Sequence, residues 1–143
     1  MAIDYSGFAI PKGSKVDGTL RRRERRAAIR SNEQAEKAKV VERDGRHTCR
    51  LVPNCRERDL FETAHLDDKG MGGDHGLRTT AETMVRACLF HHQGKWSLHS
   101  HDLRVVYLTD EQANGPIEIW GKDEDGREFL VGRETAVGVW ERD

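Results

Sequence analysis

The spacing of apolar and polar residues divides the chain into four stretches with different expected structures. Residues 1–19 contain glycines and a proline but no hydrophobic period, which predicts an extended arm. Residues 20–45 are rich in Arg, Glu, Ala and Lys, and the absence of Gly and Pro before Gly45 predicts a helix that ends there. Residues 46–102 mix short apolar runs with turns, and residues 103–143 alternate between apolar and polar positions, as strands do.

The central stretch contains a predicted strand, loop and helix in that order. Residues 60–66 form the predicted strand, and His65 lies at its end. Residues 67–76 contain four glycines and three aspartates, which predict a loop. A threonine cap with a glutamate behind it then predicts a helix over residues 80–92. The apolar side of this helix would consist of Met84, Val85, Cys88 and Leu89.

The last stretch predicts four short strands, over residues 103–108, 117–120, 128–131 and 135–140. Asp125-Gly126, between the second and third strands, is a strong signal for a hairpin turn. These elements together predict an α+β fold in which the C-terminal strands pack on the central stretch. A further expectation is that these strands mediate a homodimer.

Three cysteines and one histidine have a spacing that suits a structural zinc site. An odd number of cysteines argues against a disulfide framework, and zinc takes its ligands as two short pairs. Cys49 and Cys55 would form one pair, around a turn bent by Pro53, and Cys88 and His91 the other. The alternative is that the cysteines are small buried apolar residues. The zinc interpretation is preferred because it accounts for every cysteine at once.

Two further histidines suggest a second site beside the zinc. His92 follows His91, and neighbouring side chains on a helix diverge by about 100°, so His92 would face a different space. His65, at the end of its strand, is the natural residue to face it, and the pair could hold a catalytic metal and a proton acceptor. His99 and His101 would share one face of a strand, either adding metal or phosphate contacts or remaining without a role.

This order of residues resembles the HNH nucleases over roughly residues 40–101. The resemblance rests on the cysteine pair, Ala64-His65-Leu66, the glycine-rich loop and the run from Cys88 to His92. It implies a small zinc-stapled, treble-clef-like ββα-metal core, preceded by a basic helix and followed by β-hairpin strands. Stand-alone proteins of this kind are often encoded by phages.

The resemblance also implies a role for each site residue. His65 would be the general base, and His92 would bind a catalytic divalent cation such as Mg²⁺ or Mn²⁺. Thr83 stands where the family usually has an asparagine, and Ala64 stands where an aspartate or histidine commonly binds the catalytic metal. The leading hypothesis is a metal-dependent endonuclease that hydrolyses DNA. The alternative is a non-catalytic zinc module that binds nucleic acid or protein. The loop acids Asp67, Asp68 and Asp74 would be replacement ligands for the catalytic metal, or else simply solvated.

The charge distribution points to an anionic partner. The net charge of −1 combines 13 basic and 7 acidic residues up to position 50 with 11 basic and 18 acidic residues after it. The basic surplus includes a dense cluster on the predicted helix, which consists of Arg21, Arg22, Arg23, Arg25 and Arg26. Arginine forks suit phosphate groups, so DNA is the expected partner, although a solvated helix face paired with nearby acids is the alternative.

The same patterns exclude two other classes of protein. No apolar run approaches the roughly 20 residues that a membrane span needs. The first residues lack the basic-then-apolar order of a secretory signal, so the expected location is the cytoplasm, that of the host cell if a phage encodes the protein.

Overall fold

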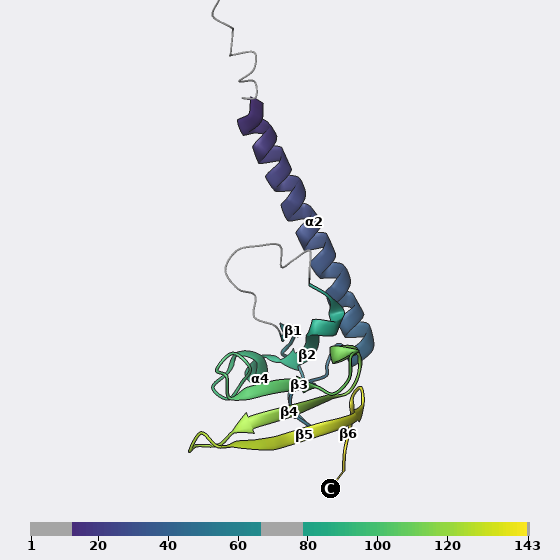
Figure 1. Ribbon diagram of the computed structural model, residues 1–143, viewed down its shortest axis with the longest axis vertical. Helices are drawn as coiled ribbons and strands as arrows, with labels where there is room; N and C mark the ends of the chain where they lie inside the picture. Colours follow the sequence, from purple (N-terminus) through teal and green to yellow (C-terminus); the bar gives the residue numbers. More distant parts are fainter. Residues whose placement is uncertain (1–12, 67–78, 143) are drawn as a thin grey trace, which may run out of the picture.

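The computed structural model describes residues 13–66 and 79–142. Along the chain these residues form a long helix, a two-stranded antiparallel sheet, a short helix and a four-stranded antiparallel sheet (Figure 1). The predicted α+β class is therefore confirmed. In the described ranges no helix combines the length and the apolar character needed to cross a membrane.

The long helix, α2, spans Gly13–Asp44 and begins inside the stretch that was predicted to be an extended arm. Its end is as predicted, because Gly45 adopts a φ of +97° and its amide donates to the Val41 carbonyl at 2.8 Å. Glycine takes this left-handed conformation without steric cost, so it ends the helix cleanly. Only the last part of α2 packs on the body, where Val40 is buried, and the earlier turns extend away from it (Figure 1).

Two strands follow the turn that carries the first cysteine pair. β1, Phe61–His65, confirms the predicted strand that ends at His65. It pairs antiparallel with β2, Met84–Cys88, so that Ala64 lies opposite Val85. The sequence between the two strands includes residues 67–78, which lie outside the described part of the chain.

The predicted helix over residues 80–92 is wrong for most of its length. A short 3-10 helix, Ala81–Thr83, leads into β2, and only Leu89–Gln93 form a helix, α4. β2 is buried on both faces, so its apolar residues run on without the alternation of a half-exposed strand. A short apolar run of this kind cannot be distinguished from one side of a buried helix by its period alone.

The second sheet has the strand order β3-β4-β5-β6. Its strands are Leu103–Tyr107 (β3), Ile117–Lys122 (β4), Glu128–Ala136 (β5) and Val139–Trp140 (β6). The hairpin turn at Asp125-Gly126 is confirmed, with Gly126 at a φ of +79°. The predicted break between the last two strands, at residues 132–134, is wrong. β5 continues through these residues to Ala136, and the turn to β6 follows it.

One apolar cluster joins the two-stranded sheet of β1 and β2 to the four-stranded sheet. Ala64 and Val85 from β1 and β2 pack with Leu103, Ile117 and Ile119 from β3 and β4, and all five side chains are buried. Cys49 and Cys88 belong to the same cluster. The predicted packing of the C-terminal strands on the central stretch is therefore present, and the cysteines border this core.

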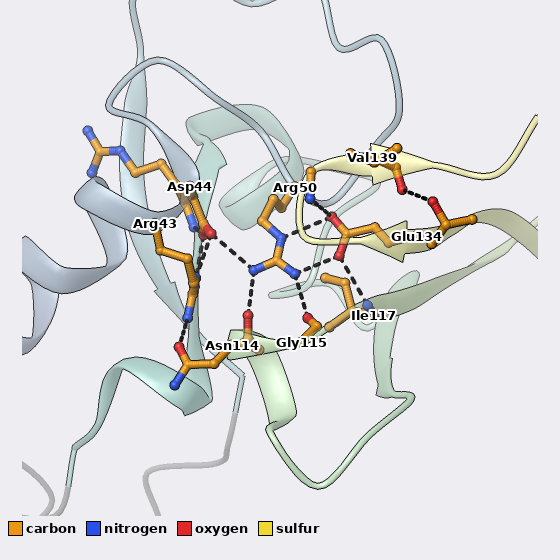
Figure 2. Close-up of polar contacts among 12 residues, drawn as sticks. Arg43, Asp44, Arg50, Asn114, Gly115, Ile117, Glu134 and Val139 are labelled. Carbon is orange, nitrogen blue, oxygen red and sulfur yellow. Dashed lines mark hydrogen bonds and ion pairs between the residues drawn. The ribbon is translucent and has the colours of Figure 1, made fainter.

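A buried ion cluster ties the helix end to the same sheet (Figure 2). The Arg50 side chain, 1% exposed, donates to the carboxylates of Asp44 and Glu134 and to the carbonyls of Ala113 and Gly115. Its distances to Asp44 and Glu134 are 3.0 Å and 2.6 Å. Each guanidinium N–H has an acceptor, which is the condition under which a buried charge is tolerated.

Candidate metal centre

The four predicted zinc ligands converge on one point. Cys49 and Cys55 lie on either side of the turn before β1, Cys88 ends β2, and His91 lies in α4. Their ligand atoms all lie within 4.8 Å of one another. We call these four residues the Cys3His cluster, and they form a group that could bind a metal ion.

Three of four distances within the Cys3His cluster match those around a tetrahedral zinc ion, and the fourth, between Cys88 and His91, is about 0.5 Å shorter. His91 Nδ1 lies 3.6 Å from the sulfurs of Cys49 and Cys55 and 3.1 Å from that of Cys88. The sulfurs of Cys55 and Cys88 are 3.8 Å apart. Zinc bonds of about 2.3 Å to sulfur and 2.1 Å to nitrogen, at tetrahedral angles, separate two sulfurs by about 3.8 Å and sulfur from nitrogen by about 3.6 Å.

Local backbone structure explains why these side chains meet. Pro53 and Asn54 form the turn between the first two cysteines, and Asn54 adopts a φ of 57°. At the second pair, Cys88 caps α4, and its sulfur accepts a hydrogen bond from the His91 amide at 3.3 Å. This bond holds the Cys88 sulfur at the start of the helix, where the side chain three residues later can reach the same ion.

The electrostatics of the Cys3His cluster also suit a cation. Burial raises the pKa of the Cys49 thiol and raises that of Cys88 to about 12, and the charge of Cys55 adds to both shifts. Burial lowers the pKa of His91, which favours the neutral imidazole that binds metals. Three thiolates at such short range need a dication to offset their desolvation and repulsion, so the residues present fit zinc.

A second group of residues surrounds a cavity of about 470 Å³ beside the Cys3His cluster. We call it the histidine cleft, and the histidines that line it are His65, His92, His99 and His101. His91 and His92 therefore face different sites, as their angular separation on a helix predicts. His65 and His92 meet at one cleft although they come from β1 and α4.

The conformation of the other two histidines was predicted wrongly. Residues 98–101 form a turn instead of a strand, and His101 has a φ of 66°. The amide of His99 donates to the carbonyl of His92 at 2.9 Å, which places this turn against α4. The two histidines reach the cleft through this turn, not through a shared strand face.

Two residues that the sequence reasoning missed complete the surroundings of His92. Arg104, on β3, lines the histidine cleft. Glu62, on β1, lies with its Oε1 atom 2.5 Å from His92 Nδ1. Glu62 stands two positions before Ala64, where the family commonly has a metal-binding residue, and side chains two apart on a strand share a face. This spacing was the sequence signal that could have revealed Glu62.

The remaining predicted residues either do not line the cleft or lie outside the described ranges. Thr83 does not line the cleft, and its hydroxyl donates to the Thr80 carbonyl at 3.0 Å. Ala64 is fully buried in the apolar core, so an acidic side chain there would be desolvated. The loop acids Asp67, Asp68 and Asp74 lie within residues 67–78, outside the described residues.

The predicted DNA-binding arginines all lie on the exposed part of α2. This set consists of Arg21, Arg22, Arg23, Arg25 and Arg26, and each is exposed. We call it the arginine cluster. It lies on the part of the helix that extends from the body in Figure 1.

No known protein family matches the chain, and no curated protein or solved structure matches it either. The interpretation of both sites accordingly depends on the residues and their geometry.

Proposed function

We propose that this protein is a metal-dependent endonuclease of the HNH type that hydrolyses DNA phosphodiester bonds. The observation that carries the proposal is the histidine cleft, in which His65 and His92 meet beside the Cys3His cluster. The order β1, β2 and α4 beside the Cys3His cluster supports the proposal, because the ββα-metal core of that family has its elements in the same order. We assign structural zinc to the Cys3His cluster, because three sulfurs and one imidazole favour zinc over harder cations.

In the proposed reaction, the imidazole of His65 accepts a proton from the attacking water molecule. The turn with His99 and His101 borders the scissile phosphate, and Arg104 adds a positive charge to the same cleft. A catalytic divalent cation, held in part by His92, would supply Lewis-acid stabilisation of the phosphate and leaving oxygen. A histidine is suited to the proton transfer because its ordinary pKa lies near neutral pH.

Nicking of supercoiled plasmid by the zinc-loaded protein tests this function. With Mg²⁺ or Mn²⁺ present, we expect His65→Ala to lower the nicking rate about 10²- to 10⁴-fold, the usual contribution of a general base. His47→Ala, which removes an exposed histidine outside the cleft, is the matched control and is expected to keep the wild-type rate. Absence of nicking with any metal, or equal nicking by the His65 variant, would contradict the proposal.

The arginine cluster is proposed to bind the DNA backbone. Arg21 and Arg22 precede Arg25 and Arg26 by one helical turn, and like charges at this spacing repel one another. Phosphate groups relieve that repulsion and accept the paired N–H groups of the guanidinium. The exposed turns of α2 give a duplex access to the cluster without contact with the rest of the body.

Replacing Arg21, Arg22 and Arg26 with Gln should weaken DNA binding and reduce its salt dependence. Each lost phosphate contact lowers the slope of log K against log salt by about 0.9. Fluorescence anisotropy of a labelled duplex over a range of salt concentrations measures this slope. The control is Arg127→Gln with Arg142→Gln, two exposed arginines in the C-terminal region, which should leave it unchanged. An unaltered slope in the triple variant would show that the cluster is only a solvated face.

The second candidate is a non-catalytic zinc module that binds nucleic acid. It is favoured by Ala64, which is buried and carries no metal-binding group, and by Thr83, which is not among the residues that line the cleft. The nicking and DNA-binding assays, carried out on the same samples, distinguish the two functions. DNA binding that depends on the arginine cluster, combined with no nicking under any metal, would support the module.

A further inference from the structure

Among the described residues, the carboxylate of Glu62 is in direct contact with His92, one of the histidines of the cleft. Glu62 Oε1 lies 2.5 Å from His92 Nδ1, and the Gln93 amide donates to the same oxygen at 2.7 Å. Strand β1 and helix α4 therefore bring an acid and an imidazole together beside the cleft, which His92 lines and Glu62 does not. The pair is semi-exposed, with 31% of the Glu62 side chain and 21% of the His92 side chain accessible, so a hydrated ion can reach it.

We propose that Glu62 and His92 together bind one divalent cation of the Mg²⁺ or Mn²⁺ class at the edge of the histidine cleft. The inference rests on the proposed function, in which His92 holds the catalytic ion, and it assigns the carboxylate ligand that His92 alone would lack. One carboxylate and one imidazole suit a hard or borderline cation that keeps several waters and takes the remaining oxygens from phosphate. The thiol-rich Cys3His cluster, in contrast, suits zinc.

The strand geometry explains why the carboxylate comes from position 62. Ala64 shares that side of β1 but is 0% exposed and lies among apolar side chains, opposite Val85. A carboxylate there would be buried in the core, which costs several kcal/mol without compensating partners. Glu62 lies opposite Ala87, two residues nearer than Ala64 to the end of the β1–β2 sheet from which α4 begins. Its longer side chain reaches that helix.

The present separation of the two ligand atoms requires only a small adjustment to admit an ion. Two ligands bound at about 2.1 Å from one octahedral cation lie about 3 Å apart, so Glu62 Oε1 and His92 Nδ1 need to separate by roughly half an ångström. A glutamate has three rotatable bonds with which to make this shift. The Gln93 amide can retain its hydrogen bond to the carboxylate meanwhile.

Mn²⁺ binding to the zinc-loaded chain tests the site without any activity measurement. Electron paramagnetic resonance detects free Mn²⁺, and Mn²⁺ does not displace zinc from thiolates because its affinity for such ligands is much lower. We expect the wild type to bind about one Mn²⁺ and Glu62→Gln to bind it at least about tenfold more weakly. Glu124→Gln, which removes an exposed glutamate from the β4–β5 turn, should bind as the wild type does.

The glutamine variant is chosen because it tests the negative charge of Glu62 separately from its hydrogen bond to His92. Gln retains an oxygen that accepts a hydrogen bond from His92 but loses the negative charge, so wild-type Mn²⁺ affinity in Glu62→Gln would overturn the proposal. Failure of the wild type to bind Mn²⁺ would also overturn it. Zinc content and the thermal midpoint of each variant establish that it is folded, and Glu62→Ala provides a second variant that should bind as weakly as Glu62→Gln.

The plasmid assay distinguishes this inference from the proposed function. If the wild type nicks DNA while Glu62→Gln binds Mn²⁺ normally, the endonuclease proposal stands and the Glu62 site is wrong. If Mn²⁺ binding depends on Glu62 but no nicking occurs, the cation site stands and the endonuclease proposal is wrong.

Discussion

Cys88→Ser is expected to lose the bound zinc and, with it, the cooperative folding of the domain. Cys88 links β2, α4 and the first cysteine pair, and its sulfur is the one closest to His91, at 3.1 Å. A structural zinc ion in small domains contributes on the order of 10–16 kcal/mol at pH 7, whereas a domain of this size is stable by only about 5–15 kcal/mol. Loss of one thiolate therefore removes most of the stabilisation that the bound ion contributes to the fold.

Elemental analysis and thermal unfolding measure these two effects together. We expect about one zinc per wild-type chain, far less in Cys88→Ser, and no sharp unfolding transition in the variant. His101→Ala removes an exposed histidine outside the Cys3His cluster, so it should retain the metal and the transition. Full zinc content and an unchanged midpoint in Cys88→Ser would mean that the cysteines are only buried apolar residues.

Arg50→Met is expected to destabilise the fold by about 3–5 kcal/mol. The substitution removes a cation that bridges Asp44 and Glu134, whose side chains are both 0% exposed. The Glu134 carboxylate would remain buried without its counterion, whereas Asp44 would keep its ion pair with Arg43 at 2.6 Å. Leaving one buried charge unpaired is much more costly than replacing a whole ion cluster with apolar groups. Glu134 retains hydrogen bonds from the amides of Ile117 and Gly138, so it stays in place and cannot escape to water.

A surface ion pair of the same type provides the control. Arg104 and Glu128 form a pair at 2.8 Å with side chains 51% and 40% exposed. Arg104→Met should cost less than about 1 kcal/mol, because exposed pairs contribute little. Urea denaturation gives both free energies of unfolding. Equal costs for the two substitutions would show that the Arg50 cluster is not a structural link between α2 and the second sheet.

The extent to which the sequence could predict the structure depended on the range of each interaction. The Cys3His cluster was predictable because each ligand pair is local, with Cys88 and His91 only three positions apart, and because zinc restricts the ligand types. Glycines at positions 45 and 126 likewise marked a helix end and a hairpin turn, since both need a positive φ.

The missed features depend on tertiary contacts that no local pattern contains. Arg50 and Glu134 are 84 positions apart, and a charged residue in a polar sequence gives no indication that it will be buried. The burial of β2 on both faces made a strand look like a helix. Glu62 was overlooked because its role depends on the approach of α4, which follows from the pairing of β1 with β2.

X-ray absorption at the zinc edge tests most directly the central claim that the Cys3His cluster is a zinc centre. The zinc-loaded protein is predicted to show three sulfur neighbours at about 2.3 Å and one nitrogen neighbour at about 2.0–2.1 Å. The Cys88→Ser variant should not reproduce this shell. A wild-type spectrum dominated by nitrogen or oxygen neighbours, with no set of three sulfurs, would contradict the assignment.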